Sequence, residues 1–189
     1  MNATAAPGRF LQVPAGLLGT VRRFVVGDRE PMDAVNVLRQ IGYELGDEVY
    51  GGLQERLSRD YGGAEWGALD PAEFWRAAAG FFADRGWGSV EFRDLHPAVG
   101  VLELSGWVES EAGGGPRGAH LSTGLFSALL ERLAGAGVAV MEVPSGSADR
   151  TRLVFARGDV LGQVYEHVRG GASLEVAVAR LGLGDGVKG

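Results

Sequence analysis

The order of helix-like and strand-like runs constrains the fold of this chain more than any other feature of its sequence. Apolar residues recur at helical spacing in some segments and alternate in others. The predicted helices cover residues 14–25, 31–57, 71–85, 121–133, 160–168 and 173–181. The predicted strands, in two consecutive pairs, cover residues 89–95, 99–109, 138–143 and 151–156. Helices alternating with pairs of strands predict an α+β fold, in which helices pack on a mostly antiparallel four-stranded sheet. This order does not fit a Rossmann or P-loop fold.

The length of 189 residues suits one domain. Residues 1–13 show no periodicity and are predicted to form a flexible N-terminal arm, and the glycine-containing segment 184–189 is predicted to be a disordered tail. We therefore expect a single domain over residues 14–183. Hydrophobic residues make up 46% of the chain and charged residues 22%, which is typical of a globular protein with a full core.

Charge and cysteine content exclude several classes of function. The net charge of −6 comes with no basic stripe, so the chain is not expected to bind nucleic acid. The sequence has no signal-peptide pattern and no apolar run of about 18 residues, which predicts a cytoplasmic protein without membrane insertion. The absence of cysteine agrees with that compartment and excludes a thiolate nucleophile and cysteine-bearing zinc sites.

The sequence predicts no catalytic residue, metal ligand or cofactor. His96, His120 and His167 share no metal-ligand spacing, and His120 is expected to cap the helix that it opens. No serine lies in a G-x-S-x-G elbow. The glycine-rich segment 113–118 lacks the lysine and serine of a P-loop, so a plain flexible loop is favoured over a phosphate site. An enzyme is therefore less favoured than a binding protein.

Two glycines lie four positions apart on the long second helix, at Gly42 and Gly46. Each costs about 1 kcal/mol relative to alanine, which is easiest to explain if another backbone approaches closely. Alternatively, the helix tolerates the two glycines and no other backbone lies close to them. The apolar stripe of this helix is longer than one small core needs, so we predict a homodimer built on the first two helices. The part of the stripe around Gly42 and Gly46 consists of Leu38, Ile41, Leu45 and Val49.

The segment from Trp107 to Phe155 resembles the 4-vinyl reductase domain, a ligand-binding domain related in fold to the subunits of the TRAPP vesicle-tethering complex and to the sensor domains of aromatic-responsive bacterial activators. The matching segments are Gly106-Trp107-Val108-Glu109-Ser110-Glu111-Ala112, His120-Leu121-Ser122-Thr123-Gly124-Leu125, Val138-Ala139-Val140-Met141-Glu142-Val143-Pro144-Ser145 and Leu153-Val154-Phe155. The three cysteines that help to bind zinc in some members stand here as His120, Ser145 and Leu153. Because leucine cannot ligate and serine is a poor ligand, no zinc is expected.

The resemblance implies a ligand site between the helical layer and the sheet, near Trp107. Strand alternation places the indole on the same face as Val101, with its N–H available to a phenol or a carbonyl. A single apolar cavity is expected to be lined by aromatic side chains from three segments. These residues are Trp107, Phe74, Phe81, Phe82 and Phe126. The alternative is that the rings pack on one another as a solid core.

Two functions remain open from the sequence. The first is a non-catalytic domain that senses or carries a small hydrophobic or aromatic ligand as a homodimer. The second is a TRAPP-like scaffold that binds protein partners without a small ligand. An enzyme such as a reductase is a third and less favoured interpretation. A cavity near Trp107 above about 300 Å³ would favour the ligand-binding function, whereas a filled core would favour the scaffold.

Overall fold

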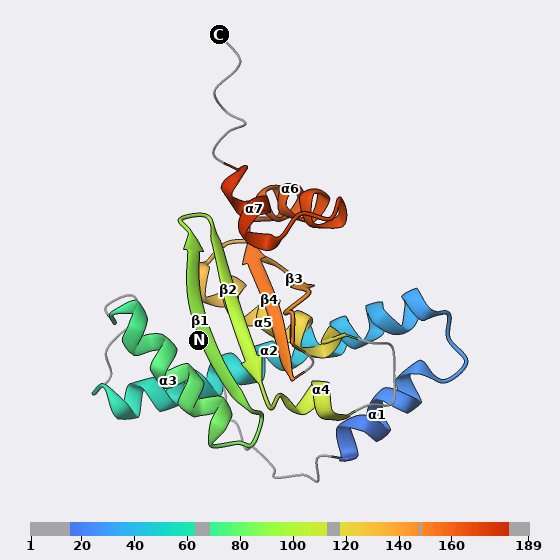
Figure 1. The fold of residues 1–189 in the computed structure, drawn as a ribbon. Coiled ribbons are helices and arrows are strands. Elements are labelled where there is room, and N and C mark those ends of the chain that lie inside the picture. Colours follow the sequence, from blue (N-terminus) through green and yellow to red (C-terminus); the bar gives the residue numbers. More distant parts are fainter. Residues whose placement is uncertain (1–15, 63–68, 113–117, 148, 182–189) are drawn as a thin grey trace.

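A computed structural model describes residues 16–62, 69–112, 118–147 and 149–181 (Figure 1). The predicted terminal arm and tail lie outside these residues, and the division into one domain at 14–183 stays a prediction. The helices are α1 (Gly16–Val26), α2 (Pro31–Asp60), α3 (Pro71–Ala83), α4 (Val108–Ala112), α5 (His120–Ala134), α6 (Gly158–Arg169) and α7 (Leu174–Ala179). The strands are β1 (Ser89–His96), β2 (Val99–Ser105), β3 (Ala139–Val143) and β4 (Arg150–Ala156). The predicted α+β fold is confirmed.

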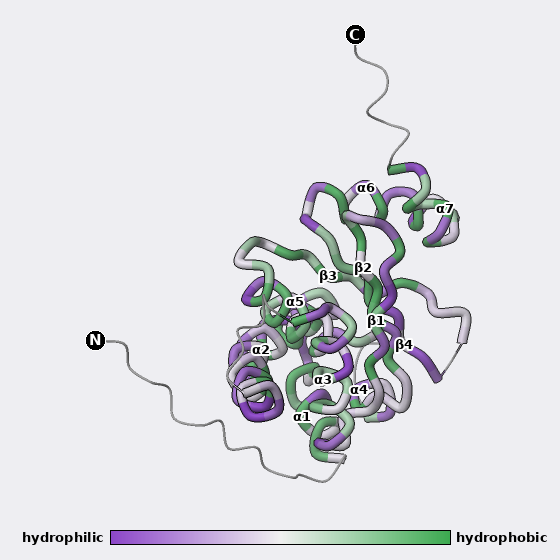
Figure 2. The backbone as a smooth tube through the Cα atoms, turned by 90° about the vertical axis from the view of Figure 1, so that its left-hand side faces the viewer, coloured by the Kyte–Doolittle hydropathy of each residue, from purple (hydrophilic) through white to green (hydrophobic). Residues whose placement is uncertain are grey.

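The four strands form one antiparallel sheet in the order β1-β2-β4-β3. Each predicted pair of strands is a hairpin, and the two hairpins meet where β2 pairs with β4. Strand alternation gives the sheet two different faces. On one face Leu102, Leu104 and Leu153 belong to a large core with α2, α3 and α5, whereas on the other Val101 and Val154 belong to a smaller core with α6 and α7. Figure 2 shows α2, α3 and α5 together on one side of the strands, with α6 and α7 at one end.

The helix α3 begins as its sequence predicts. Asp70 is the N-cap, and its Oδ1 accepts a hydrogen bond of 2.8 Å from the backbone N–H of Ala72. Pro71 occupies the first helical position, where its missing N–H costs nothing. This local signal sets where α3 begins.

The glycines of α2 are explained by a second helix of the same chain. An ideal Cβ built on Gly42 would overlap the carbonyl oxygen of Leu121 in α5, and one on Gly124 in α5 would overlap the carbonyl oxygen of Arg39. A Cβ on Gly46 would lie 2.5 Å from the Cβ of Ala128. The predicted close backbone approach is therefore confirmed. The attribution of these glycines to a dimer interface is wrong, because α5 already covers them.

The strand predicted over residues 99–109 ends at Ser105, so the prediction is wrong for its last four residues. Gly106 adopts a φ of +53°, a left-handed conformation that favours glycine, and the chain then enters the short helix α4. This turn also breaks the strand alternation. Trp107 consequently lies in the core of α2, α3 and α5, on the face opposite to Val101, and the expectation that the two share a face is wrong.

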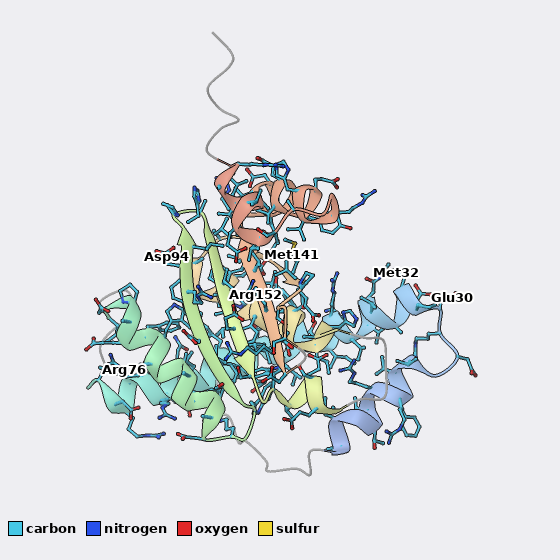
Figure 3. All side chains as sticks on the ribbon, in the orientation of Figure 1. Glu30, Met32, Arg76, Asp94, Met141 and Arg152 are labelled. Atoms are coloured by element: carbon cyan, nitrogen blue, oxygen red, sulfur yellow. The ribbon has the colours of Figure 1, made fainter. Side chains whose placement is uncertain are left out.

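The N-terminal helix lies outside the sheet and keeps an apolar face exposed. In Figure 1, α1 and the first half of α2 extend beyond the sheet. Leu17, Val21 and Phe24 lie on one stripe of α1, and Phe24 is 80% exposed. Figure 3 labels Met32 at the outer end of α2, where it is 68% exposed. In the described ranges, no helix combines the length and hydropathy needed to cross a membrane.

Candidate ligand-binding site

Aromatic side chains from two helices, α3 and α5, and from the segments that follow α3 and β2 meet on one face of the sheet. They form what we call the ring cluster, made of Phe81, Phe82, Trp87, Trp107 and Phe126. The ring centroid of Phe82 lies 5.5 Å from those of both Trp107 and Phe126. The centroids of Trp107 and Phe126 are 5.8 Å apart, as are those of Trp107 and Trp87. Trp107 is 1% exposed and Phe82 is fully buried. The cluster is therefore an apolar site in which every ring touches another.

The structure brings four of the five predicted lining residues into ring contact and places the fifth in the same core beside a different ring. Phe82, Trp107 and Phe126 form a triangle of contacts, and Phe81 meets Phe82 edge-on at 5.4 Å. Phe74 belongs to the same hydrophobic core but packs edge-on against Trp75 at 5.2 Å. Trp75 in turn stacks on Phe92 of β1, with centroids 4.8 Å apart. Phe74 therefore belongs to a second group of rings toward the β1 edge.

Local sequence positions each ring of the cluster. Phe81 and Phe82 follow Phe74 by seven and eight positions on α3, so all three face the sheet. The turn at Gly106 delivers Trp107, and the N–H of Val108 donates to the carbonyl of Trp87 at 2.9 Å, which ties the two tryptophan segments together. The guanidinium of Arg85 covers the outer face of Phe81, 3.6 Å from the ring centroid. Burial there lowers the pKa of Arg85 below its usual value.

The indole N–H of Trp107, which the sequence led us to expect free for a ligand, is engaged within the protein. It donates to the hydroxyl oxygen of Ser122 at 2.6 Å. The Ser122 hydroxyl donates in turn to Oε2 of Glu109, also at 2.6 Å. The expectation of a free indole donor is therefore wrong. Its cause is the turn at Gly106, which brings the indole against the start of α5.

Glu109 is a charged side chain, 1% exposed, and it caps the first turn of α5. Its Oε1 accepts from the backbone N–H of Leu121 at 2.9 Å, and its Oε2 accepts from the N–H of Ser122 at 2.7 Å. These amides are among those that a helix start leaves without an intrahelical partner, and the helix dipole favours a negative charge there. His120 was expected to provide the cap, but the N-cap position is Ala119, with no side-chain capping bond.

Arg22 of α1 completes the buried polar group. Its Nη1 lies 3.5 Å from Oε1 of Glu109 and donates to the backbone carbonyl of the same residue at 3.0 Å. Its Nη2 donates to the carbonyl of Gly118 at 3.3 Å. The helix α1 is thereby connected to the ring cluster through Arg22, Glu109, Ser122 and Trp107.

His120, Ser145 and Leu153, which stand where some family members have cysteines, lie in different surroundings. His120 begins α5 and lies beside Gly118 and the carboxylate of Glu142, whose Oε2 accepts from the N–H of Ala119 at 2.7 Å. The Ser145 hydroxyl is bound within its own turn, to the carbonyl oxygens of Ser147 and Arg150. Leu153 is buried in the large core. Within the described ranges, no group of three histidine or carboxylate side chains is placed to hold a metal ion.

Sequence reasoning missed the residues that connect the ring cluster to the rest of the protein. Trp87 follows Gly86 and carries no periodic signal. Ser122 and Glu109 are 13 positions apart, and Arg22 is 87 positions from Glu109. The only available signal was a charged arginine within the apolar pattern of the first helix, which indicates a buried partner without identifying it.

Comparison with known proteins shows the fold of this chain. No family model matches the sequence, and no curated protein matches it. Solved structures do match. One is the crystal structure of the phenol-responsive sensory domain of the transcription activator PoxR with phenol. The TM-score is 0.60 at 13% sequence identity, and the match covers 88% of this chain and 84% of that one.

Proposed function

We propose that this chain is a non-catalytic domain that binds a small aromatic or hydrophobic ligand at the ring cluster, as a sensor or a carrier. The observation that carries the proposal is the position of the cluster. Rings from α3, from the segment after β2 and from α5 converge between the helical layer and the sheet, in a fold similar to that of a phenol-responsive sensory domain.

The chemistry of the cluster supports an aromatic ligand. Aromatic rings prefer edge-to-face and offset contacts at centroid distances of about 4.5–7 Å. The contacts of Phe82 with Trp107 and of Trp107 with Trp87 are of the edge-to-face type. A planar ligand that enters between two of these rings replaces one ring–ring contact by two ring–ligand contacts. Such an exchange requires the rings to separate, and the guanidinium of Arg85 lies over the ring of Phe81.

We propose that the chain is a divergent 4-vinyl-reductase-type domain, on the strength of the motifs around Trp107 and the similarity of fold. We also propose that it acts in the cytoplasm as a homodimer, in which the exposed stripe of α1 at Leu17, Val21 and Phe24 is the contact. A ligand signal in such a protein passes to the second copy or to a protein partner.

A scaffold without a small ligand is the second candidate, and a specific observation favours it. Trp107 and Phe82 are almost completely buried by their neighbours, as in a solid core. A TRAPP-like assembly module would need nothing more from these rings than packing.

Titration of the protein with N-phenyl-1-naphthylamine, a fluorescent apolar probe, separates the two candidates. We expect saturable binding that Trp107→Ala weakens at least severalfold. The matched control is Leu161→Ala, which removes a buried side chain from the smaller core of α6 and α7. Both variants lose stability, by about 2–5 kcal/mol, but the control keeps the probe affinity. Absence of saturable binding in the unaltered protein, or equal binding by Trp107→Ala, would leave the scaffold as the better account.

A further inference from the structure

The polar groups beside the ring cluster are bonded to one another, and this restricts the chemistry of the ligand. We propose that the cluster selects aromatic ligands that lack a hydroxyl group, and that Ser122 is the residue that sets this selectivity. This inference rests on the proposed function, since it names the class of ligand for the same site.

The directions of the two short hydrogen bonds follow from the groups involved. An indole N–H only donates, and an ionised carboxylate only accepts. The Ser122 hydroxyl, placed 2.6 Å from both Nε1 of Trp107 and Oε2 of Glu109, must therefore accept from the indole and donate to the carboxylate. The single hydroxyl proton and the single indole proton are both used. A ligand oxygen in the cluster finds neither donor available.

Glu109 keeps the serine in this orientation. Its carboxylate is held in place by the backbone N–H groups of Leu121 and Ser122 and by Arg22 at 3.5 Å. If the hydroxyl of Ser122 turned toward a ligand, a buried carboxylate oxygen would lose one of its donors. Leaving a buried charged group short of a hydrogen bond is costly. Glu109 thus acts as a positioning residue for Ser122.

The remaining buried polar side chains of the described segments are also engaged. Apart from Arg22, Glu109 and Ser122, they are Glu103, Thr123 and Thr151. The Thr123 hydroxyl donates to the carbonyl of Ala119, and Thr151 shares a hydrogen bond of 2.7 Å with Ser110. Glu103 accepts from Arg152 on the opposite face of the sheet. A ligand oxygen would give up the donors that water offers it and gain none from these side chains.

The test compares toluene with phenol, which have nearly the same shape, by competition against N-phenyl-1-naphthylamine. Because toluene is the more hydrophobic of the two, the informative quantity is the ratio of their affinities in each variant. Ser122→Ala frees the indole N–H for the phenol oxygen, and we expect it to raise the affinity for phenol relative to toluene by about tenfold, the effect of one hydrogen bond. Ser127→Ala is the matched control, because Ser127 lies on the same helix and donates to the carbonyl of Val138 away from the cluster.

A second variant keeps the proposal testable if Ser122→Ala does not fold. Trp107→Phe removes the N–H but keeps an aromatic ring, and we expect it to leave the phenol-to-toluene ratio of the unaltered protein unchanged. An unchanged ratio in Ser122→Ala, or a selective loss of phenol binding in Trp107→Phe, would overturn the selectivity while leaving the proposed function intact. Binding of neither compound by the unaltered protein would contradict the proposed function and this inference with it.

Discussion

Arg22 and Glu109 form a buried ion pair across 87 positions of sequence, with Nη1 of the arginine 3.5 Å from Oε1 of the glutamate. Both side chains are less than 5% exposed. The pair joins α1 to the start of α5, and Glu109 is also bonded to Ser122, the partner of Trp107. The position of α1 and the polar edge of the ring cluster are therefore part of one hydrogen-bonded group.

Breaking this pair is expected to destabilise the protein strongly. Arg22→Met keeps an apolar chain of similar length but leaves the Glu109 carboxylate buried without its cation, which costs about 3–5 kcal/mol. Arg23→Met is the matched control, because Arg23 is the next residue on the same helix and is exposed. Urea unfolding measures the free energy of unfolding of both variants. A loss below about 1 kcal/mol in Arg22→Met, in the range of a surface ion pair, would show that Glu109 is satisfied by its helix amides alone.

The close crossing of α2 and α5 predicts opposite effects for two glycines of one helix. Gly42→Ala places a methyl group against the carbonyl of Leu121, so we expect the helices to be forced apart, with a loss of about 1–3 kcal/mol or more from overpacking. Gly51→Ala places the same methyl group where no atom lies within 4 Å. There the better helix propensity of alanine is expected to stabilise the protein by about 0.5–1 kcal/mol. Thermal unfolding gives the melting temperature of each variant. Equal shifts in melting temperature would contradict a close approach of α2 and α5 at Gly42.

The exposed stripe of α1 predicts where a homodimer would form. Sedimentation equilibrium at tens of micromolar is expected to show a dimer, which Phe24→Asp dissociates because it buries a charge in an apolar contact. Tyr165→Asp, at a large side chain of α6 that is 50% exposed, is the control and should leave association unchanged. A monomer in the unaltered protein removes the dimer from the account. A dimer that only Tyr165→Asp weakens would move the interface to α6.

The sequence was sufficient where the signal was local. The apolar periodicity of each helix and strand lies within a few residues, so the α+β fold and the order of all elements except the short helix α4 were predicted correctly. The grouping of Phe81, Phe82, Trp107 and Phe126 was also predicted, because helical period and the resemblance both point to one layer.

The remainder of the site depends on contacts that no local pattern encodes. One left-handed glycine, Gly106, ends β2 four residues early and turns Trp107 to the face opposite Val101. That turn also brings Glu109 to the start of α5, which removes the need for a cap at His120. Similarly, glycines at 42 and 46 indicate a close neighbour, but their spacing does not say whether that neighbour belongs to the same chain.

Intermolecular nuclear Overhauser effects from toluene report directly whether a ligand binds at the ring cluster. The measurement uses the unaltered protein with saturating toluene and resolves the methyl protons of the ligand against the aromatic protons of the protein. We expect cross-peaks from toluene to the rings of Phe82, Trp107 and Phe126, which lie within 5.5–5.8 Å of one another in the free protein. Cross-peaks confined to exposed rings such as Phe24, or no cross-peaks at saturation, would show that toluene does not bind at the ring cluster.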